Sequence, residues 1–220
     1  MTPELFGKAL GRLIEMVVLG MAHIKIGRGL ARAMGDDPAI ANVSPVFWGM
    51  TITAHLDVAQ LIAFKLFDER SGSMTIEYLL ARAEELKQSF PNASPTQVEA
   101  VVKIARGQIQ GTLEAPLTKI RAKRNRVLAH SDPTIIRNPG KLTKEVELTF
   151  SDLNAVLNVA GIVLNEVSVA FRDTSPLYEM IGADDYEMAV SLIADAKCAQ
   201  VRAYETEFGP WEHLRPKKCQ

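Results

Sequence analysis

The sequence predicts an all-α protein, a bundle of about five to six helices. Apolar residues recur at steps of three and four over long stretches, which is the periodicity of amphipathic helices. Proline, glycine and serine clusters separate these stretches. With 47% hydrophobic and 23% charged residues, the 220-residue chain has the composition of an ordinary globular protein. It is long enough to bury a substantial core.

The periodic stretches define six helices, at residues 3–34, 45–67, 75–90, 95–130, 151–172 and 186–208. Ser44-Pro45 and Ser94-Pro95 each place a capping hydroxyl before a proline in the first helical position. Pro116 predicts a kink in the fourth helix. The alternation in "EVELTF" predicts only a short extended segment near residues 145–150, because six residues are few for a strand.

These elements are expected to form one domain over residues 1–208, followed by a loosely held tail at 209–220. No internal repeat or low-complexity segment divides the chain. The apolar run "MVVLGMA" lies between Glu15 and His23, and no run reaches the roughly 20 residues that cross a bilayer. We therefore expect no membrane partner. The N-terminus lacks the features of a secretory signal. Cys198 and Cys219 form no disulfide framework, which agrees with a cytoplasmic protein, and no role is assigned to them.

The densest local charge lies in "KIRAKRNRVLAHSDP", residues 119–133, in a chain with a formal net charge of only -1. One explanation is structural, because cations near a helix C-terminus interact favourably with its dipole by about 0.3–1 kcal/mol each. The other is chemical, and rests on the spacing between Arg124 and His130. Chance alone produces such a spacing easily, so the meaning depends on its context: a polar amide at Asn125, a helix end, and the following "AHSD".

The stretch "RNRVLAHSD" resembles the signature of the HEPN superfamily, all-helical proteins that often act as metal-independent ribonucleases. Upstream, "HLDVAQLIAFKLFD" followed by "MTIEYLL" resembles the AbiU-like abortive-infection branch. The resemblance covers about residues 44–195. It implies a HEPN-like helical domain, an endoribonuclease with a toxin-like or phage-defence role, RNA as substrate, a homodimer, and an antitoxin or other protein as a further partner.

The chemistry of metal-independent RNA cleavage suits the residues that the resemblance marks. The 2′-hydroxyl attacks the adjacent phosphate and leaves a cyclic phosphate, so one group must move protons and another must stabilise charge. His130 titrates near neutral pH and suits the first task. The planar guanidinium of Arg124 suits the second. Asn125 would orient the imidazole or the phosphate.

Residues near this catalytic set each have two possible roles. Arg121, Lys123 and Arg126 are candidate RNA contacts, although for Arg126 a solvated basic side chain is the favoured explanation. Asp132 either holds the His130 imidazole in one tautomer or caps the turn before Pro133. Some HEPN proteins carry a modifiable tyrosine at the position of Asp132, so that form of regulation is not expected here.

Geometry limits how Arg124 and His130 can meet. Six residues along an ideal helix separate them by about 9 Å in rise and about 120° in direction. Either the helix bends or frays at "AHSDP", or a second copy of the chain completes the site. The second arrangement predicts a homodimer.

No cofactor or metal is expected. His55 and Asp57 are too few to bind a metal by themselves, His23 and His213 are isolated, and no phosphate-binding loop is present. The acidic pairs at 36–37 and 184–185 are expected to cap helices. The alternative function is a catalytically inactive HEPN-like module that binds RNA, nucleotide or a protein partner.

Overall fold

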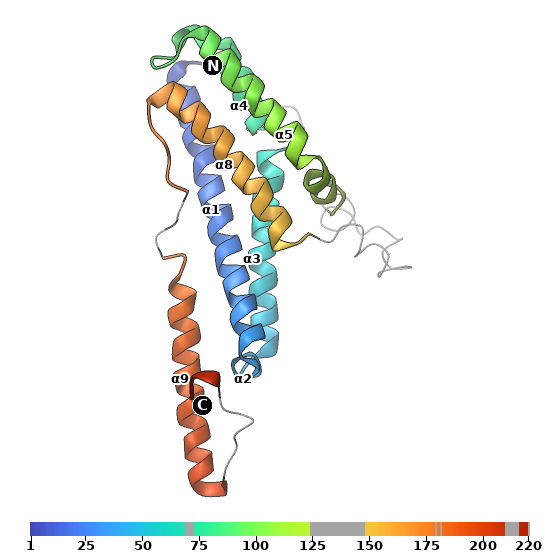
Figure 1. Ribbon diagram of the computed structural model, residues 1–220, viewed down its shortest axis with the longest axis vertical. Coiled ribbons are helices and arrows are strands. Elements are labelled where there is room, and N and C mark those ends of the chain that lie inside the picture. Colours follow the sequence, from blue (N-terminus) through green and yellow to red (C-terminus); the bar gives the residue numbers. More distant parts are fainter. Residues whose placement is uncertain (69–72, 124–147, 179, 181, 210–215, 220) are drawn as a thin grey trace. The chain divides into compact units, whose positions relative to one another are not determined.

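The computed structural model describes residues 1–68, 73–123, 148–178, 180, 182–209 and 216–219 (Figure 1). Every regular element among these residues is helical, which confirms the all-α prediction. The longer helices are α1 (Pro3–Asp36), α3 (Pro45–Leu66), α4 (Ile76–Glu85), α5 (Pro95–Lys123), α8 (Phe150–Arg172) and α9 (Asp185–Phe208). Three short elements accompany them: α2 (Pro38–Ala41) and the 3₁₀ turns η1 (Lys87–Ser89) and η4 (Lys217–Cys219).

Local side-chain caps explain several helix starts. Thr75 accepts a hydrogen bond from the backbone of Tyr78 at 3.2 Å and begins α4. Asp37 accepts from Ala39 at 3.1 Å and begins α2, so this carboxylate caps a helix as predicted. Each cap satisfies a backbone N–H that has no partner within its own helix.

Of the extended segment predicted near residues 145–150, the structure describes only residues 148–150, and they form no strand. Phe150 is already helical, and Thr149, although extended, is the N-cap of α8. Residues 145–147 lie outside the described residues. Helix α5 runs through Pro116 to Lys123, and its predicted continuation to His130 also lies outside them.

By their internal contacts, the described residues form two compact units. Unit 1 comprises Met1–Met21 and Ala59–Tyr178, and unit 2 comprises Ala22–Val58 and Glu179–Gln220. Helices α1 and α3 contribute residues to both. The single domain expected over residues 1–208 remains a prediction.

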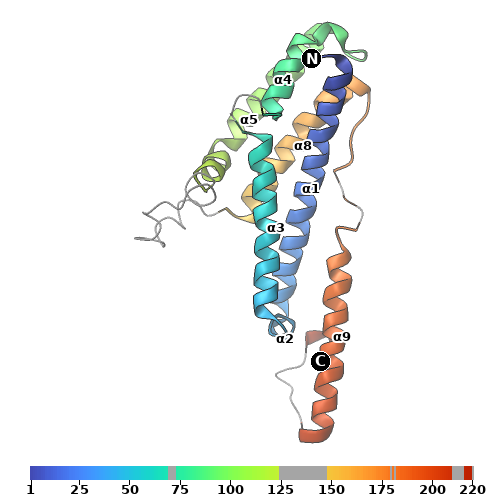
Figure 2. The same ribbon diagram turned by 180° about the vertical axis from the view of Figure 1, so that it is seen from behind.

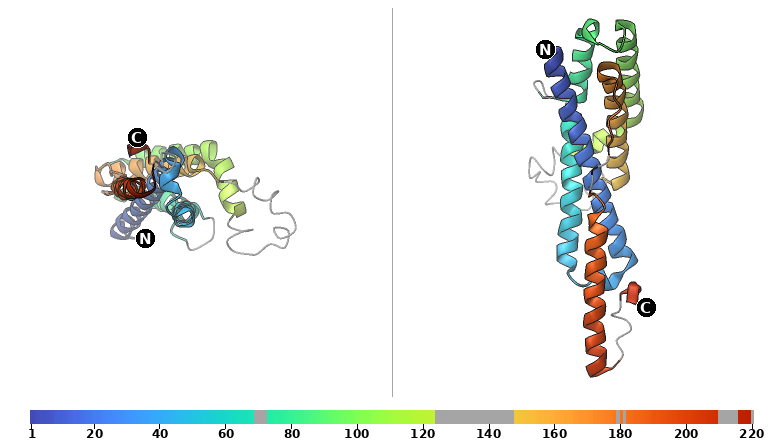
Figure 3. Two further views of the ribbon diagram at one scale, coloured as in Figure 1. Left: turned by 90° about the horizontal axis from the view of Figure 1, so that it is seen from below. Right: turned by 90° about the vertical axis from the view of Figure 1, so that its left-hand side faces the viewer.

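Unit 1 has an apolar core built by α4, α5, α8 and the unit 1 parts of α1 and α3. Helices α5 and α8 lie side by side, as Figures 1 and 3 show. Phe6, Phe90 and Phe171 pack edge to face, with ring centroids 4.9–5.4 Å apart. Gly20 allows α1 to approach α8, because a Cβ atom there would lie 2.7 Å from Leu157. Edge-to-face packing and close helix contact are typical of a well-packed core.

Unit 2 comprises the rest of α1 and α3, with α2, α9 and η4. Figure 2 shows α1 and α3 running alongside each other. Helix α9 is attached to α1 by the ion pair between Lys25 and Asp184, at 2.7 Å. The ring of Tyr186 occupies the space that a side chain at Gly29 would need. Asp184 makes no side-chain capping bond, so its predicted capping role is wrong and its carboxylate pairs with Lys25 instead.

The described part of the C-terminal tail is attached to unit 2 by specific contacts. Cys198 on α9 and Cys219 form a disulfide with Cα atoms 6.0 Å apart. The backbone N–H of Lys217 donates to the carboxylate of Asp37 at 2.8 Å, and Pro216 is buried. The two cysteines therefore have a structural role that their sequence positions did not indicate, and these tail residues are not loosely held.

Two described helices, α3 and α8, are long and apolar enough to cross a membrane by length and composition alone. Core helices pass the same test, and 56% of the apolar window of α8 is buried, against 28% of that of α3. The sequence shows no uninterrupted apolar run of this length in α3, because polar residues such as Asp57 and Gln60 lie within it. The absence of a membrane partner remains a prediction.

Candidate functional site

The predicted catalytic residues Arg124, Asn125 and His130 lie outside the described residues, as do Arg126 and Asp132. Their arrangement is therefore neither confirmed nor contradicted. The structure does describe the two elements from which this segment leaves and to which it returns, namely the end of α5 and the beginning of α8. Lys123, the residue before Arg124, is the last residue of α5.

The end of α5 is tied directly to the beginning of α8. The ammonium group of Lys119 lies 3.3 Å from a carboxylate oxygen of Asp152. Leu117 and Ile120 on α5, and Leu153 and Leu157 on α8, are buried in the same unit. Both ends of the motif-bearing segment are thus attached to one packed pair of helices.

Helix α8 begins with a reciprocal capping box. The backbone N–H of Asp152 donates to the Thr149 hydroxyl, and the backbone N–H of Thr149 donates to the Asp152 carboxylate, both at 3.0 Å. Burial alone would raise the pKa of Asp152, but hydrogen bonds from Thr149 and Lys119 outweigh it, so this pKa lies below its ordinary value. The helix N-terminus therefore carries its own stabilising anion, as the helix dipole favours.

The predicted RNA contacts are described only in part. Arg121 is half-buried on α5, and the side chain of Lys123 lies outside the description. Lys119, which the charge cluster also contains, is committed to Asp152. Lys119 therefore has a structural role through its contact with Asp152, which is a different role from the helix-dipole interaction considered for the cluster.

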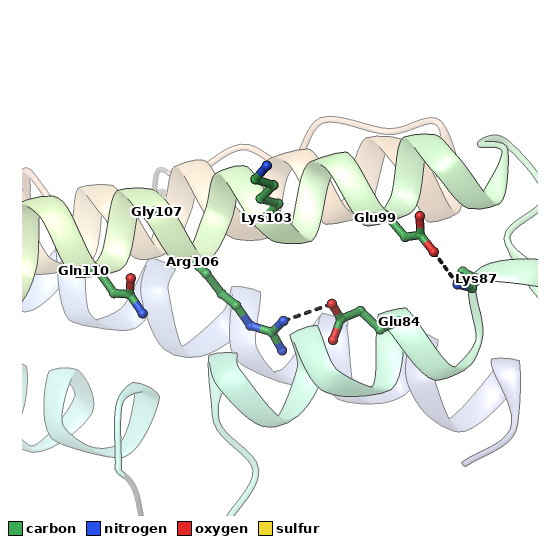
Figure 4. Close-up of a pocket in the computed structure, with 7 residues that line it drawn as sticks. All are labelled: Glu84, Lys87, Glu99, Lys103, Arg106, Gly107 and Gln110. Carbon is green, nitrogen blue, oxygen red and sulfur yellow. Dashed lines mark hydrogen bonds and ion pairs between the residues drawn. The ribbon is translucent and has the colours of Figure 1, made fainter.

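A groove of about 720 Å³ lies between the α4–η1 region and α5 (Figure 4). Arg106 bridges Glu77 and Glu84 across it, at 2.8 and 2.9 Å, and Lys87 pairs with Glu99. The hydrogen bond that Arg106 donates to the Glu77 carboxylate is the main cause that raises the pKa of Arg106. Arg106 and Lys87 are thus paired with carboxylates and join the α4–η1 region to α5, while Lys103 also lines the groove.

Unit 2 contains a cluster that the linear sequence did not reveal. The Nδ1 atoms of His23 on α1 and His55 on α3 lie 2.9 Å apart, and their ring centroids are 4.9 Å apart. We call these two residues the histidine pair. Burial lowers the pKa of both imidazoles, and the proximity of His55 lowers that of His23 further. No regular spacing connects residues 23 and 55, so only the tertiary structure identifies the pair.

The helical fold, and a basic Arg124–His130 motif that follows a long helix directly, define the class as a HEPN-like domain. A family model for AbiU2 HEPN domains matches residues 38–191, which is more than half of the chain and includes the motif. The chain belongs to the AbiU2 family and contains an abortive-infection HEPN-like domain. Searches of curated proteins and of solved structures find no significant match.

Proposed function

We propose that this protein is a metal-independent endoribonuclease that acts in abortive infection as a toxin-like or phage-defence factor. The observation that carries the proposal is the position of the motif: it begins at the residue after α5 within the family match, and the segment returns to the start of α8. The Lys119–Asp152 contact keeps these two helix ends together. RNA is the substrate, and the cytoplasm is the expected location.

In the proposed reaction His130 removes the proton of an RNA 2′-hydroxyl while that oxygen attacks the adjacent phosphorus. Arg124 stabilises the charge that grows on the phosphoryl oxygens, and Asn125 orients the reacting groups. The P–O5′ bond breaks and the leaving 5′ oxygen takes up a proton from water, so the products are a 2′,3′-cyclic phosphate and a 5′-hydroxyl. Arg121, Lys123 and Arg126 contact the RNA backbone, and Asp132 either orients His130 or stabilises the turn.

A homodimer is part of the proposal. An ideal helix would place the Arg124 and His130 side chains about 120° apart, so two copies facing one cleft bring an arginine and a histidine together more easily than one copy does. Light scattering at micromolar concentration should therefore give the mass of a dimer. A monomer that still cleaves RNA would show that one chain bends its own helix to build the site.

The decisive experiment is cleavage of single-stranded RNA by purified protein in EDTA, with analysis of the product ends. His130→Ala and Arg124→Ala should each reduce the rate by about 10²–10⁴-fold, the usual contribution of acid–base groups. The matched controls are His213→Ala and Arg202→Ala, which remove the same residue types elsewhere and should cleave normally. Full activity in His130→Ala would disprove the mechanism.

The same assay distinguishes the alternative function, a catalytically inactive module, from the proposed ribonuclease. RNA binding that weakens steeply with salt, without cleavage by the wild type, would identify an inactive RNA-binding module. Absence of both RNA binding and cleavage would point to a purely structural dimerisation protein or to a module that binds a protein partner.

A further inference from the structure

The histidine pair presents the same ring atom of two imidazoles to each other. His23 and His55 come from different helices, and both are half-exposed, so solvent reaches them. At a separation of 2.9 Å the two Nδ1 atoms either share one proton in a hydrogen bond or, with both hydrogens on Nε2, direct two lone pairs at nearly the same point. The second arrangement is repulsive unless a cation lies between the nitrogens.

We propose that His23 and His55 together bind a divalent transition-metal ion through their Nδ1 atoms. Neutral imidazole is a preferred protein ligand for copper, nickel and zinc. Metal coordination requires the neutral form of the imidazole. The two histidines are not part of the Arg124–His130 motif, and the proposal assigns them no role in RNA cleavage.

The spacing also indicates which ion is favoured. Bonds of about 2.05 Å from two nitrogens 2.9 Å apart meet at an angle of about 90° at the metal. That angle matches neighbouring positions of a square-planar or tetragonal Cu(II) or Ni(II) ion. It is narrower than the tetrahedral angle that Zn(II) prefers.

Water is expected to fill the remaining coordination positions. No group of three or more histidine, cysteine, aspartate or glutamate side chains with metal-binding geometry occurs in the part of the chain that the structure describes. A two-ligand site of this kind is weaker than a closed structural one, and it exchanges its ion with solvent. Its physical effect is to join α1 to α3, so a bound ion should raise the thermal unfolding midpoint of the protein.

The first test is titration of untagged, full-length protein with Ni(II) at pH 7.5, followed by calorimetry and thermal unfolding. One equivalent should bind and raise the midpoint. Loss of a residue that only orients a ligand costs about 10–100-fold in metal affinity, so His23→Gln and His55→Gln should each weaken binding at least that much. His213→Gln is the control and should bind as the wild type does. Unchanged affinity in the first two variants would overturn the proposal.

A second measurement needs no variant and so does not depend on how the variants fold. The electron paramagnetic resonance spectrum of the wild type with one equivalent of Cu(II) should show tetragonal copper with two equatorial imidazole nitrogens. A spectrum with a single nitrogen, or no stoichiometric binding of either ion, would also overturn the proposal. Because RNA cleavage is expected in EDTA, failure of the metal site leaves the ribonuclease proposal intact, and the reverse holds as well.

Discussion

The two units differ in what holds them together. The largest side chains that are completely buried in the described residues all belong to unit 1. They are Phe6, Leu10, Leu13, Val17, Leu66, Ile76, Leu79, Leu80, Leu113, Leu153, Leu157 and Leu164. Unit 2 buries fewer large apolar side chains, and those it buries, such as Trp48, Ile24 and Leu30, keep 3–6% exposure.

Unit 2 relies instead on individual contacts: the Cys198–Cys219 disulfide, the histidine pair, and the ring of Tyr186 over Gly29. Apolar burial changes little with redox state or with pH near neutrality, whereas each of these contacts depends on a single chemical group. Unit 2 should therefore respond to reductant, to acid and to a methyl group at Gly29, while unit 1, which carries the motif-bearing segment, should respond neither to reductant nor to acid near neutrality.

Reduction of the disulfide is expected to have the largest effect. Cys198 and Cys219 are 21 residues apart in sequence, and closing a loop of that size contributes about 3 kcal/mol in the chain-entropy description. Reductant should lower the free energy of unfolding by about this amount. Hydrogen exchange, followed by mass spectrometry, should then accelerate in α9 and remain unchanged in α4 and α8.

Cys219→Ser is the matched control, since it should exchange like the reduced wild type and ignore reductant. Equal acceleration in both units would contradict the comparison. The experiment also bears on location, because disulfides are rare in the reducing cytoplasm that the sequence predicts. If the protein is cytoplasmic, the reduced form with the weaker unit 2 is its working state.

The sequence predicted the helices well because their signals are local. The Ser44-Pro45 pair correctly predicted that α3 begins at Pro45. The apolar periodicity predicted the last residues of α3 and α8 to within one residue of the observed ends. The start of α8 was placed at Ser151 rather than Phe150 because Thr149, not a serine, provides the cap. Helix α2 was missed because four residues are too few to show a period.

The contacts of unit 2 could not be read in the same way. His23 meets His55, and Gly29 meets Tyr186, across separations that no helical or strand period connects. Two cysteines in a chain of 220 residues likewise say nothing about whether their Cα atoms lie 6.0 Å apart. At the motif the opposite holds: the sequence names Arg124 and His130, and the described helices show only where their segment begins and ends.

A single methyl group at Gly29 is expected to have the second-largest effect. Gly29→Ala would place its Cβ atom inside the ring of Tyr186 and force α9 to move, at a cost of about 1–3 kcal/mol. Gly35→Ala, on the same helix, meets no atom within 4 Å and should stabilise α1 by about 0.5–1 kcal/mol. Urea unfolding of the two variants should therefore show opposite changes.

Tyr186 provides the internal check on this assignment. If the clash is the cause, Gly29→Ala should cost much less in a Tyr186→Ala background. An unchanged cost in the double variant would place the strain elsewhere in unit 2.

Acidification from pH 7.5 to 5.5 is expected to have the smallest effect. The pKa values of His23 and His55 lie below the ordinary value of 6.5, chiefly because burial disfavours the charged ring. The unfolded chain therefore binds more protons than the folded chain as pH falls below 6.5, so stability present above 6.5 is lost as pH falls through the folded values. Hydrogen exchange in the unit 2 parts of α1 and α3 measures this loss.

Unit 1 provides the reference in the same experiment. The pKa of Asp152 is lowered from its ordinary value of 3.8, so its contribution is present above 3.8 and is lost only as pH falls further, below the range tested. After correction for the intrinsic pH dependence of exchange, the hydrogen-exchange rate in α8 should stay constant on acidification. The rate around the histidine pair should rise. In His55→Gln, which removes one of the two rings, the pH dependence in unit 2 should diminish. An undiminished dependence would mean that groups other than the histidine pair make unit 2 sensitive to acid.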